Sequence, residues 1–145
     1  MFQKILVPMD GSEAAMSALE IAAKLSLLTG GTITILTVYR HHGMLEASLS
    51  MVRRDNPDPL DDVLRDHASG IAKSAKEHAQ ALGAKDPRAF VRNGPVARSI
   101  LAFAKEHEND LIVLGSRGAG TVDQYLLGSV SHKVTSVAEC PVLVV

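Results

Sequence analysis

The sequence contains a single cysteine, Cys140, and no apolar run long enough to cross a membrane. One cysteine excludes an internal disulfide, and without ligand partners at motif spacing it argues against a structural zinc site. We therefore expect Cys140 to be a small buried hydrophobic residue. The first ten residues, MFQKILVPMD, hold a short apolar run that Pro8 and Asp10 interrupt, so we expect no signal sequence and no membrane insertion, and predict a cytoplasmic protein.

The sequence also lacks a marked excess of positive or negative charge. The 15 Lys and Arg residues nearly balance the 16 Asp and Glu residues, whereas proteins that neutralise a nucleic acid backbone carry a basic field. We therefore expect no nucleic acid partner. An apolar fraction of 46% over 145 residues is typical of one globular domain, which we place at residues 1–145.

Short runs rich in β-branched residues alternate with longer stretches of helical period, a pattern typical of βαβ units. The predicted strands are Lys4–Pro8, Thr32–Tyr39, 88–92, 110–115 and 141–145, and the predicted helices are Glu13–Thr29, 60–82, 95–107 and 128–138. The first and fourth strands, with ILV and LIVL, are apolar without alternation, as expected for central strands covered on both faces. The sequence thus predicts an α/β fold, a single doubly wound five-stranded parallel sheet with helices on both faces.

Ligands of a doubly wound sheet bind in the crevice at the carboxyl ends of the strands where the winding reverses. If the first and fourth strands are neighbours there, residues 8–10 line one side of the crevice, and Leu114 and Gly115 line the other. The one long connection, residues 40–56, is a candidate lid or docking surface, or else a plain surface excursion.

A glycine-rich loop, GSRGAGTVDQYLLGSVS, runs from Gly115 to Ser131. Glycines allow positive φ and close approach of the backbone, which exposes N–H groups to an anion. The helix start at 128–131 favours phosphate, and Arg117 offers a charge-assisted contact. The loop is neither a P-loop nor a dinucleotide fingerprint. It predicts a site for a nucleotide phosphate; the alternative is a tight strand-to-helix turn with Ser129 as the helix cap.

Three segments, MDGS, DLIVLGSRG and CPVLVV, together with the spacing Gly115-x2-Gly118-x9-Gly128-Ser129, resemble the universal stress protein family, and the resemblance covers the whole chain. In that family this glycine spacing marks the ATP-binding branch. The resemblance implies the strand order 3-2-1-4-5 of the adenine nucleotide alpha hydrolase-like fold. It also implies a bound adenine nucleotide, ATP or else ADP or AMP, with Mg²⁺ or Mn²⁺ on the phosphates. The segment 41–53, HHGMLEASLSMVR, resembles the corresponding loop of TeaD-like stress proteins, which are linked to osmolyte transporters.

The resemblance also implies which residues contact the nucleotide. Pro8, Met9 and Asp10 would meet the adenosine, with the Asp10 carboxylate near the ribose, and Val38 would line the adenine pocket. The ribose and phosphates would be held by Leu114, Gly115, Arg117, Gly118, Gly128, Ser129, Val130 and Ser131. Asp10 has a second interpretation as the amino cap of the first helix, a role that Ser12 also offers. The additional Gly120 departs from the family pattern and would loosen the loop.

Hydrolysis of the nucleotide would need a base or a water-positioning group at the γ-phosphate, and the sequence offers no clear candidate. We therefore assign no catalytic residue and no metal site, and expect a nucleotide-dependent regulatory module of the stress response with little or no hydrolysis. The alternative is an enzyme of the adenosine-binding α/β superfamily that hydrolyses ATP slowly, or transfers a nucleotidyl group with help from Asp10 and Ser129. A phosphoacceptor receiver domain is a third and weaker alternative.

The apolar strand at 141–145 is expected at a sheet edge, which invites aggregation unless something covers it. We therefore predict a homodimer that pairs these strands. The regulated partner would be a membrane transporter or another protein.

Overall fold

The computed structural model describes residues 1–40, 59–117 and 127–145. Its elements are β1 (Lys4–Pro8), α1 (Glu13–Thr29), β2 (Thr32–Tyr39), α3 (Pro59–Ala81), β3 (Arg88–Asn93), α4 (Val96–Glu106), β4 (Leu111–Leu114), α5 (Ser129–Val137) and β5 (Val142–Val144). The first two strands and the first helix have the predicted bounds, and the ends of the other predicted elements were wrong by one residue at most. The ends of such elements depend on single terminal hydrogen bonds, which a sequence pattern does not resolve. Of the long connection at 40–56, all but the first residue lies outside the described residues.

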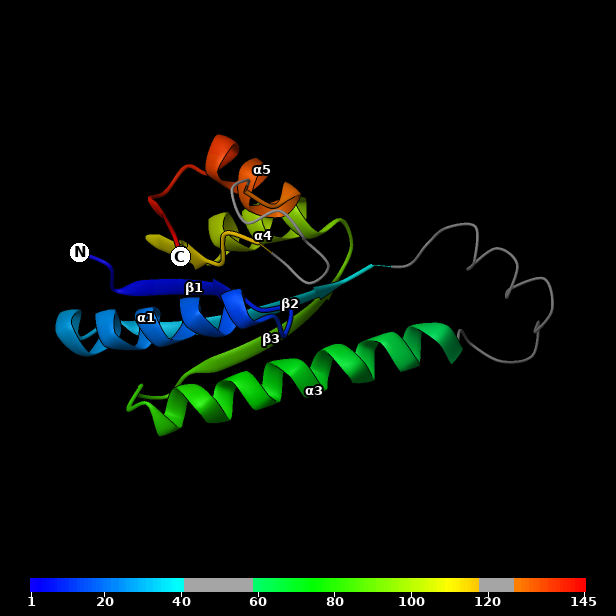
Figure 1. Cartoon of the computed structure of the whole chain (residues 1–145), viewed down its shortest axis with the longest axis horizontal. Coiled ribbons are helices and arrows are strands. Elements are labelled where there is room, and N and C mark those ends of the chain that lie inside the picture. The colour runs from blue at the N-terminus through cyan, green and yellow to red at the C-terminus, as the bar shows by residue number, and fades with distance from the viewer. Residues whose placement is uncertain (41–58, 118–126) are drawn as a thin grey trace.

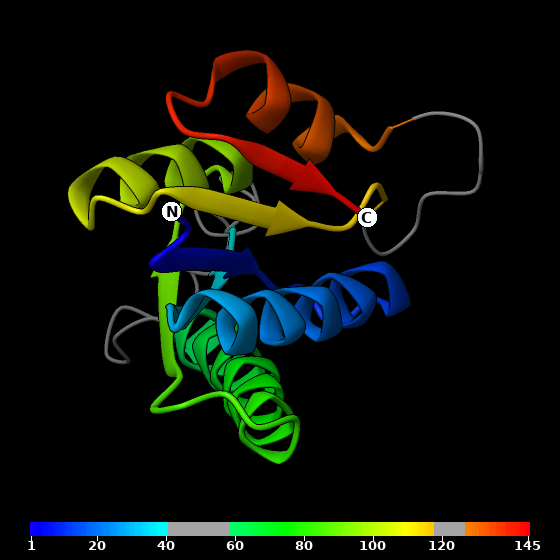
Figure 2. The same cartoon turned by 90° about the vertical axis from the view of Figure 1, so that its left-hand side faces the viewer.

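The five strands form one parallel sheet in the order β3-β2-β1-β4-β5, as predicted. Figures 1 and 2 show α1 and α3 on one face of the sheet and α4 and α5 on the other. The chain adds β2 and β3 on one side of β1, and β4 and β5 on its other side. The carboxyl ends of β1 and β4 are therefore neighbours at the point where the winding reverses.

Each face of the sheet has its own apolar core. Toward α1 and α3 the buried residues include Ile5, Val7, Ile33, Ile35 and small alanines of both helices. Toward α4 and α5 they include Leu6, Leu36, Ile100, Phe103, Ile112 and Val134. Successive residues of β1 thus point into opposite cores, which explains why the ILV run is apolar at every position.

The start and the end of α1 are held by specific contacts. Ser12 is the N-cap, because its Oγ accepts the N–H of Ala15 at 3.2 Å. The interpretation of Asp10 as the cap is wrong; its Oδ1 accepts the N–H of Ser12 at 2.9 Å and shapes the turn before the helix. The helix ends at Gly30, whose φ of 76° lies in the left-handed region that glycine adopts without steric cost.

Asp110 joins the amino ends of β1 and β4. Its carboxylate accepts the backbone N–H of Gln3 at 2.8 Å and of Lys4 at 2.9 Å, across more than 100 residues of sequence. These two hydrogen bonds hold the start of β1 against the residue that precedes β4.

Cys140 is half-buried beside the core of α4 and α5, so the expectation of a buried residue was only partly right. It precedes β5, which has a neighbouring strand on one side only, and this edge position leaves the residue partly open. Burial raises the pKa of the Cys140 thiol, and the charges of Asp110 and Glu139 raise it further. The thiol is therefore a poor nucleophile at neutral pH.

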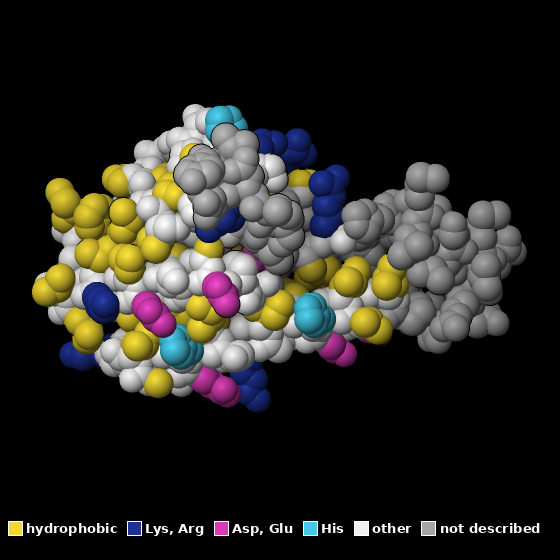
Figure 3. Space-filling model, viewed as in Figure 1, with side chains coloured by type: hydrophobic (Ala, Val, Ile, Leu, Met, Phe, Trp, Pro, Cys, Tyr) yellow, Lys and Arg dark blue, Asp and Glu magenta, His cyan; other side chains and the backbone are white. Residues whose placement is uncertain are grey.

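Exposed apolar side chains gather at the end of the molecule where α1 finishes, as Figure 3 shows. Leu27 and Leu28 are 58% and 83% exposed. This end lies at the amino ends of the strands, away from the edge where a ligand is expected. No helix among the described residues combines the length and apolar character that a membrane span requires.

Candidate functional site

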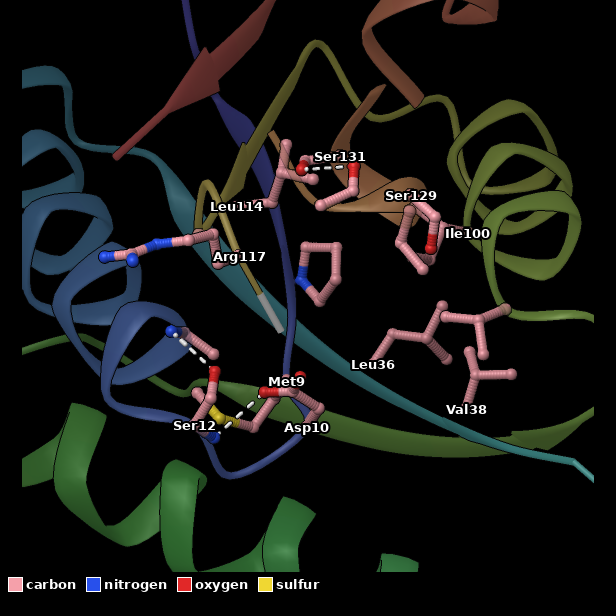
Figure 4. A pocket seen from close by; sticks show the side chains of 16 residues that line it. Met9, Asp10, Ser12, Leu36, Val38, Ile100, Leu114, Arg117, Ser129 and Ser131 are labelled. Carbon is pink, nitrogen blue, oxygen red and sulfur yellow. Dashed lines mark hydrogen bonds between the residues drawn. The ribbon is translucent and has the colours of Figure 1, made fainter. Parts of the chain in front are cut away.

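A cavity of about 220 Å³ opens at the carboxyl ends of β1, β2 and β4. Its lining comes from the residues that follow β1, from the ends of β2 and β4, and from the first turns of α1, α4 and α5. Figure 4 shows Leu36 and Val38 on one side, Arg117 on the opposite side, and Ser129 and Ser131 at the start of α5. The cavity thus occupies the position at which the winding of the sheet reverses, where the sequence predicts a ligand.

The cavity brings together the residues that the resemblance assigned to the nucleotide. Its lining includes Pro8, Met9, Asp10, Val38, Leu114, Gly115, Arg117, Gly128, Ser129, Val130 and Ser131. The remaining predicted residue, Gly118, lies outside the described residues, as does the additional Gly120. Residues of β1, β2, β4 and α5 and of the segments beside them, some more than 100 positions apart, therefore converge on one space.

One wall of the cavity is apolar and includes residues that the sequence analysis missed. Leu36 and Val38 come from one face of β2, and Val96 and Ile100 come from successive turns of α4. Leu36 was detectable, because residues two apart on a strand share a face and Val38 was already assigned. The contribution of α4 was not, since it depends on how that helix crosses the sheet. Ser12 and Ala15, at the start of α1, complete the missed set.

The amino end of α5 is another part of the lining. Gly128 is the N-cap and has no side chain that could cap the helix, so the alternative in which Ser129 is the cap is wrong; Ser129 is the first helical residue. The N–H groups of Ser129, Val130 and Ser131 have no acceptor in the described part of the chain. Together with the helix dipole, such unpaired N–H groups attract an anion.

The two serines at the start of α5 differ in where their hydroxyl groups lie. Ser131 is 3% exposed, and its Oγ donates to the carbonyl oxygen of Ser116 at 2.8 Å and lies 3.0 Å from that of Gly128. Ser129 is exposed and lines the cavity. The Ser129 hydroxyl is therefore placed to meet a ligand, whereas the Ser131 hydroxyl is used within the protein.

The structure gives Gly115 a role that was not predicted. A Cβ atom on this residue would lie 2.7 Å from the backbone carbonyl carbon and the Cβ of Ala14, in the first turn of α1. Neither Gly115 nor Gly128 has the positive φ that we expected of the loop glycines, and the φ of Gly128 is −63°. Gly115 therefore permits the close approach of the end of β4 to α1, at a position that also lines the cavity.

The charges around the cavity are few. Within the described lining, Arg117 is the one cation and Asp10 the one anion. Arg117 is half-buried, and Figure 4 shows its side chain extending away from Val38 and Ile100. Asp10 is exposed, with Oδ1 accepting the N–H of Ser12. The cavity therefore combines an apolar wall with two features that attract an anion, Arg117 and the start of α5.

Comparison with known proteins agrees with the fold and with the predicted family. The model of the universal stress protein family matches residues 1–145. The chain belongs to the universal stress protein family. The universal stress protein YxiE of Bacillus subtilis is 36% identical over 148 residues, which cover all of this chain and 99% of that protein.

Solved structures of universal stress proteins share the fold. The structure of UspA from Lactobacillus plantarum has a TM-score of 0.81 and 28% identity, and the match covers 99% of this chain and 97% of that one. A universal stress protein crystallised in complex with cAMP has a TM-score of 0.75 and 26% identity, with 99% and 96% covered. A structural neighbour in this family thus binds an adenine nucleotide.

Proposed function

We propose that this universal stress protein binds an adenine nucleotide, ATP or else ADP or AMP, and acts as a nucleotide-dependent regulatory module with little or no hydrolysis. The observation that carries the proposal is the division of one cavity into an apolar wall at Leu36, Val38 and Ile100 and an anion-attracting end at α5. Nucleotides have the matching division between a flat base and charged phosphates. The cAMP complex of a relative supports the same choice.

Each part of a nucleotide has a counterpart in the cavity. The base would lie against the wall formed by Val38 and Ile100, and the ribose near Asp10. The phosphates would accept hydrogen bonds from the N–H groups at 129–131, which have no acceptor among the described residues, with Arg117 adding charge. Because Asp10 is the one carboxylate in the described lining, Mg²⁺ or Mn²⁺ would be held mainly by phosphate oxygens.

The proposal of little or no hydrolysis rests on the side chains near α5. General-base catalysis needs a group within hydrogen-bond reach of the attacking water. The described residues that line the cavity around α5 are glycine, serine and valine, and the carboxylate of Asp10 comes from the other side, after β1. If Asp10 nevertheless activates a water, the alternative of a slow hydrolase or nucleotidyl transferase applies.

Heating purified protein and identifying the released small molecule by chromatography tests whether a nucleotide is bound. Titration calorimetry with ATP and adenosine then tests the assignment of the two sides. We expect Arg117→Gln to weaken ATP binding about tenfold and adenosine binding little, because a charge-assisted contact to phosphate is lost. Arg98→Gln, which removes an exposed cation of α4 outside this cavity, is the matched control.

Absence of any bound or titrated nucleotide would reject the proposed function. Steady release of phosphate from ATP by clean protein, abolished by Asp10→Asn, would instead favour the enzyme alternative. An Arg117→Gln variant that loses ATP and adenosine binding equally would reject the assignment of the phosphates to the Arg117 side.

The proposed regulatory unit is a homodimer that pairs the β5 strands. β5 has one neighbouring strand, and its Leu143 is 38% exposed. We expect Leu143→Glu to give a monomer in light scattering, whereas Leu28→Glu, at an exposed apolar position of α1, leaves the dimer intact. A wild-type monomer, or a dimeric Leu143→Glu variant, would reject this arrangement.

The cytoplasmic location remains a prediction, as does a membrane transporter or another protein as the regulated partner. The segment 41–53, on which the resemblance to TeaD-like proteins rests, lies outside the described residues.

A further inference from the structure

The backbone of Ser116, two residues after β4, makes hydrogen bonds to the start of α5 and to the end of the chain. The Ser116 carbonyl oxygen accepts two hydrogen bonds from the start of α5, one from the N–H of Gly128 at 2.7 Å and one from the Oγ of Ser131 at 2.8 Å. On its other side, the N–H of Ser116 donates to the carbonyl oxygen of Val145 at 2.8 Å. The first turn of α5 is thus tied to the end of β4, which is itself tied to β5.

We propose that Ser131 is a positioning residue of the nucleotide site, whose hydroxyl holds the first turn of α5 so that the backbone N–H groups of this turn converge on the phosphates. This inference rests on the proposed function and refines it, because the resemblance assigned Ser131 to the ligand itself. Its hydroxyl proton is committed to carbonyl oxygens inside the protein, at a site that is 3% exposed. Ser131 therefore acts on the phosphates through the backbone of α5.

The neighbouring hydroxyl groups show why Ser131 differs from the rest of α5. Ser136 donates to the carbonyl oxygen of His132 at 2.8 Å, four residues earlier in the same helix, and that contact is exposed. Ser131 alone among the serines of α5 connects the helix to β4. Loss of the Ser136 contact should leave the position of α5 unchanged. Loss of the Ser131 contact leaves the bond from the Gly128 N–H to hold this turn at Ser116, so the first turn is held less firmly relative to β4.

The test compares the affinities of wild type, Ser131→Ala, Ser131→Thr and Ser136→Ala for ATP and for adenosine by calorimetry. If the first turn of Ser131→Ala is correctly placed only about a tenth of the time, the Kd for ATP rises about tenfold. Adenosine has no phosphate, so its Kd should change less than about twofold in the same variant. Ser131→Thr should restore ATP binding, because threonine keeps a hydroxyl that can donate to the Ser116 carbonyl oxygen. Ser136→Ala should bind both ligands as the wild type does.

Three outcomes would overturn the inference: unchanged ATP affinity in Ser131→Ala, an equal loss for ATP and adenosine, or a Ser131→Thr variant as weak as Ser131→Ala. If the wild type binds neither ligand, the proposed function fails first and the inference fails with it. Should Ser131→Ala not fold, Ser131→Cys takes its place, since a thiol is of similar shape and a weak donor, and the same comparison of ATP with adenosine decides.

Discussion

Replacement of Gly115 by alanine should destabilise the protein by about 1–3 kcal/mol, the usual cost of forcing an additional methyl group into a packed site. The new Cβ would lie 2.7 Å from the carbonyl carbon and the Cβ of Ala14 and 3.0 Å from its carbonyl oxygen. Optimal contacts between carbon atoms lie at about 3.5–4.0 Å. Because Ala14 follows the Ser12 cap in the first turn of α1, either that turn or the end of β4 has to move.

Gly70→Ala is the matched control, since it makes the same chemical change inside α3, where no atom beyond the adjacent backbone of the helix lies within 4 Å of the new methyl group. In an exposed helix interior, alanine is favoured over glycine by about 0.5–1 kcal/mol. Urea unfolding followed by circular dichroism measures both variants. With a slope of about 2 kcal/mol per M, the midpoint should fall by about 0.5–1.5 M for Gly115→Ala and rise by about 0.2–0.5 M for Gly70→Ala.

A Gly115→Ala midpoint equal to or above that of the wild type would refute the explanation by close packing. Gly115 also lines the cavity, so the displacement should be felt by a ligand. We expect Gly115→Ala to weaken ATP binding and Gly70→Ala to leave it unchanged, which calorimetry on the two folded variants would determine.

Three further predictions concern the rest of the fold. Ser12→Ala should lower the free energy of unfolding by about 1 kcal/mol through loss of the N-cap. The exposed Ser17→Ala in the same helix should not, and equal urea midpoints for the two variants would contradict the capping role. Phe103→Ala should lower the free energy of unfolding by about 3–5 kcal/mol, because the residue is 2% exposed and its ring stacks on that of His107, with the ring centroids 3.8 Å apart. A decrease below about 1 kcal/mol in urea unfolding would be inconsistent with that burial. Cys140 should be alkylated by iodoacetamide more slowly than free cysteine at mildly alkaline pH, because its raised pKa keeps the thiol protonated. Unfolding in urea should remove the difference in rate. Equal rates for the folded protein and free cysteine would argue against the raised pKa.

The strands were predictable because the interior of a parallel sheet requires apolar residues on both faces. The ILV run of β1 and the LIVL run of β4 meet that requirement, because every residue in them is apolar, and both strands are internal to the sheet. The order of the remaining strands came from the resemblance to a family, since periodicity does not determine which strands are neighbours. The same resemblance led to Val38 and to the residues after β4, which all line the cavity where they are described.

What the sequence did not reveal depends on contacts between distant residues. Gly115 was recognised as important, but its partner Ala14 lies about 100 positions earlier, and nothing local distinguishes a need for positive φ from a need for close packing. Ser129 and Ser131 look equivalent in the sequence. Only the position of Ser116 beneath α5 separates the hydroxyl that faces the cavity from the one that is bonded inside the protein.

The place of β1 in the sheet has a consequence for how the chain is made. Its neighbour β2 follows directly after α1, but its other neighbour, β4, comes only after α3, β3 and α4. During synthesis the amino end of a domain leaves the ribosome first. The edge of β1 that later pairs with β4 therefore has no neighbouring strand until most of the chain has been made. An open strand edge can pair with other chains. The interval before Asp110 reaches the amino end of β1 is therefore when the nascent chain is most exposed to aggregation.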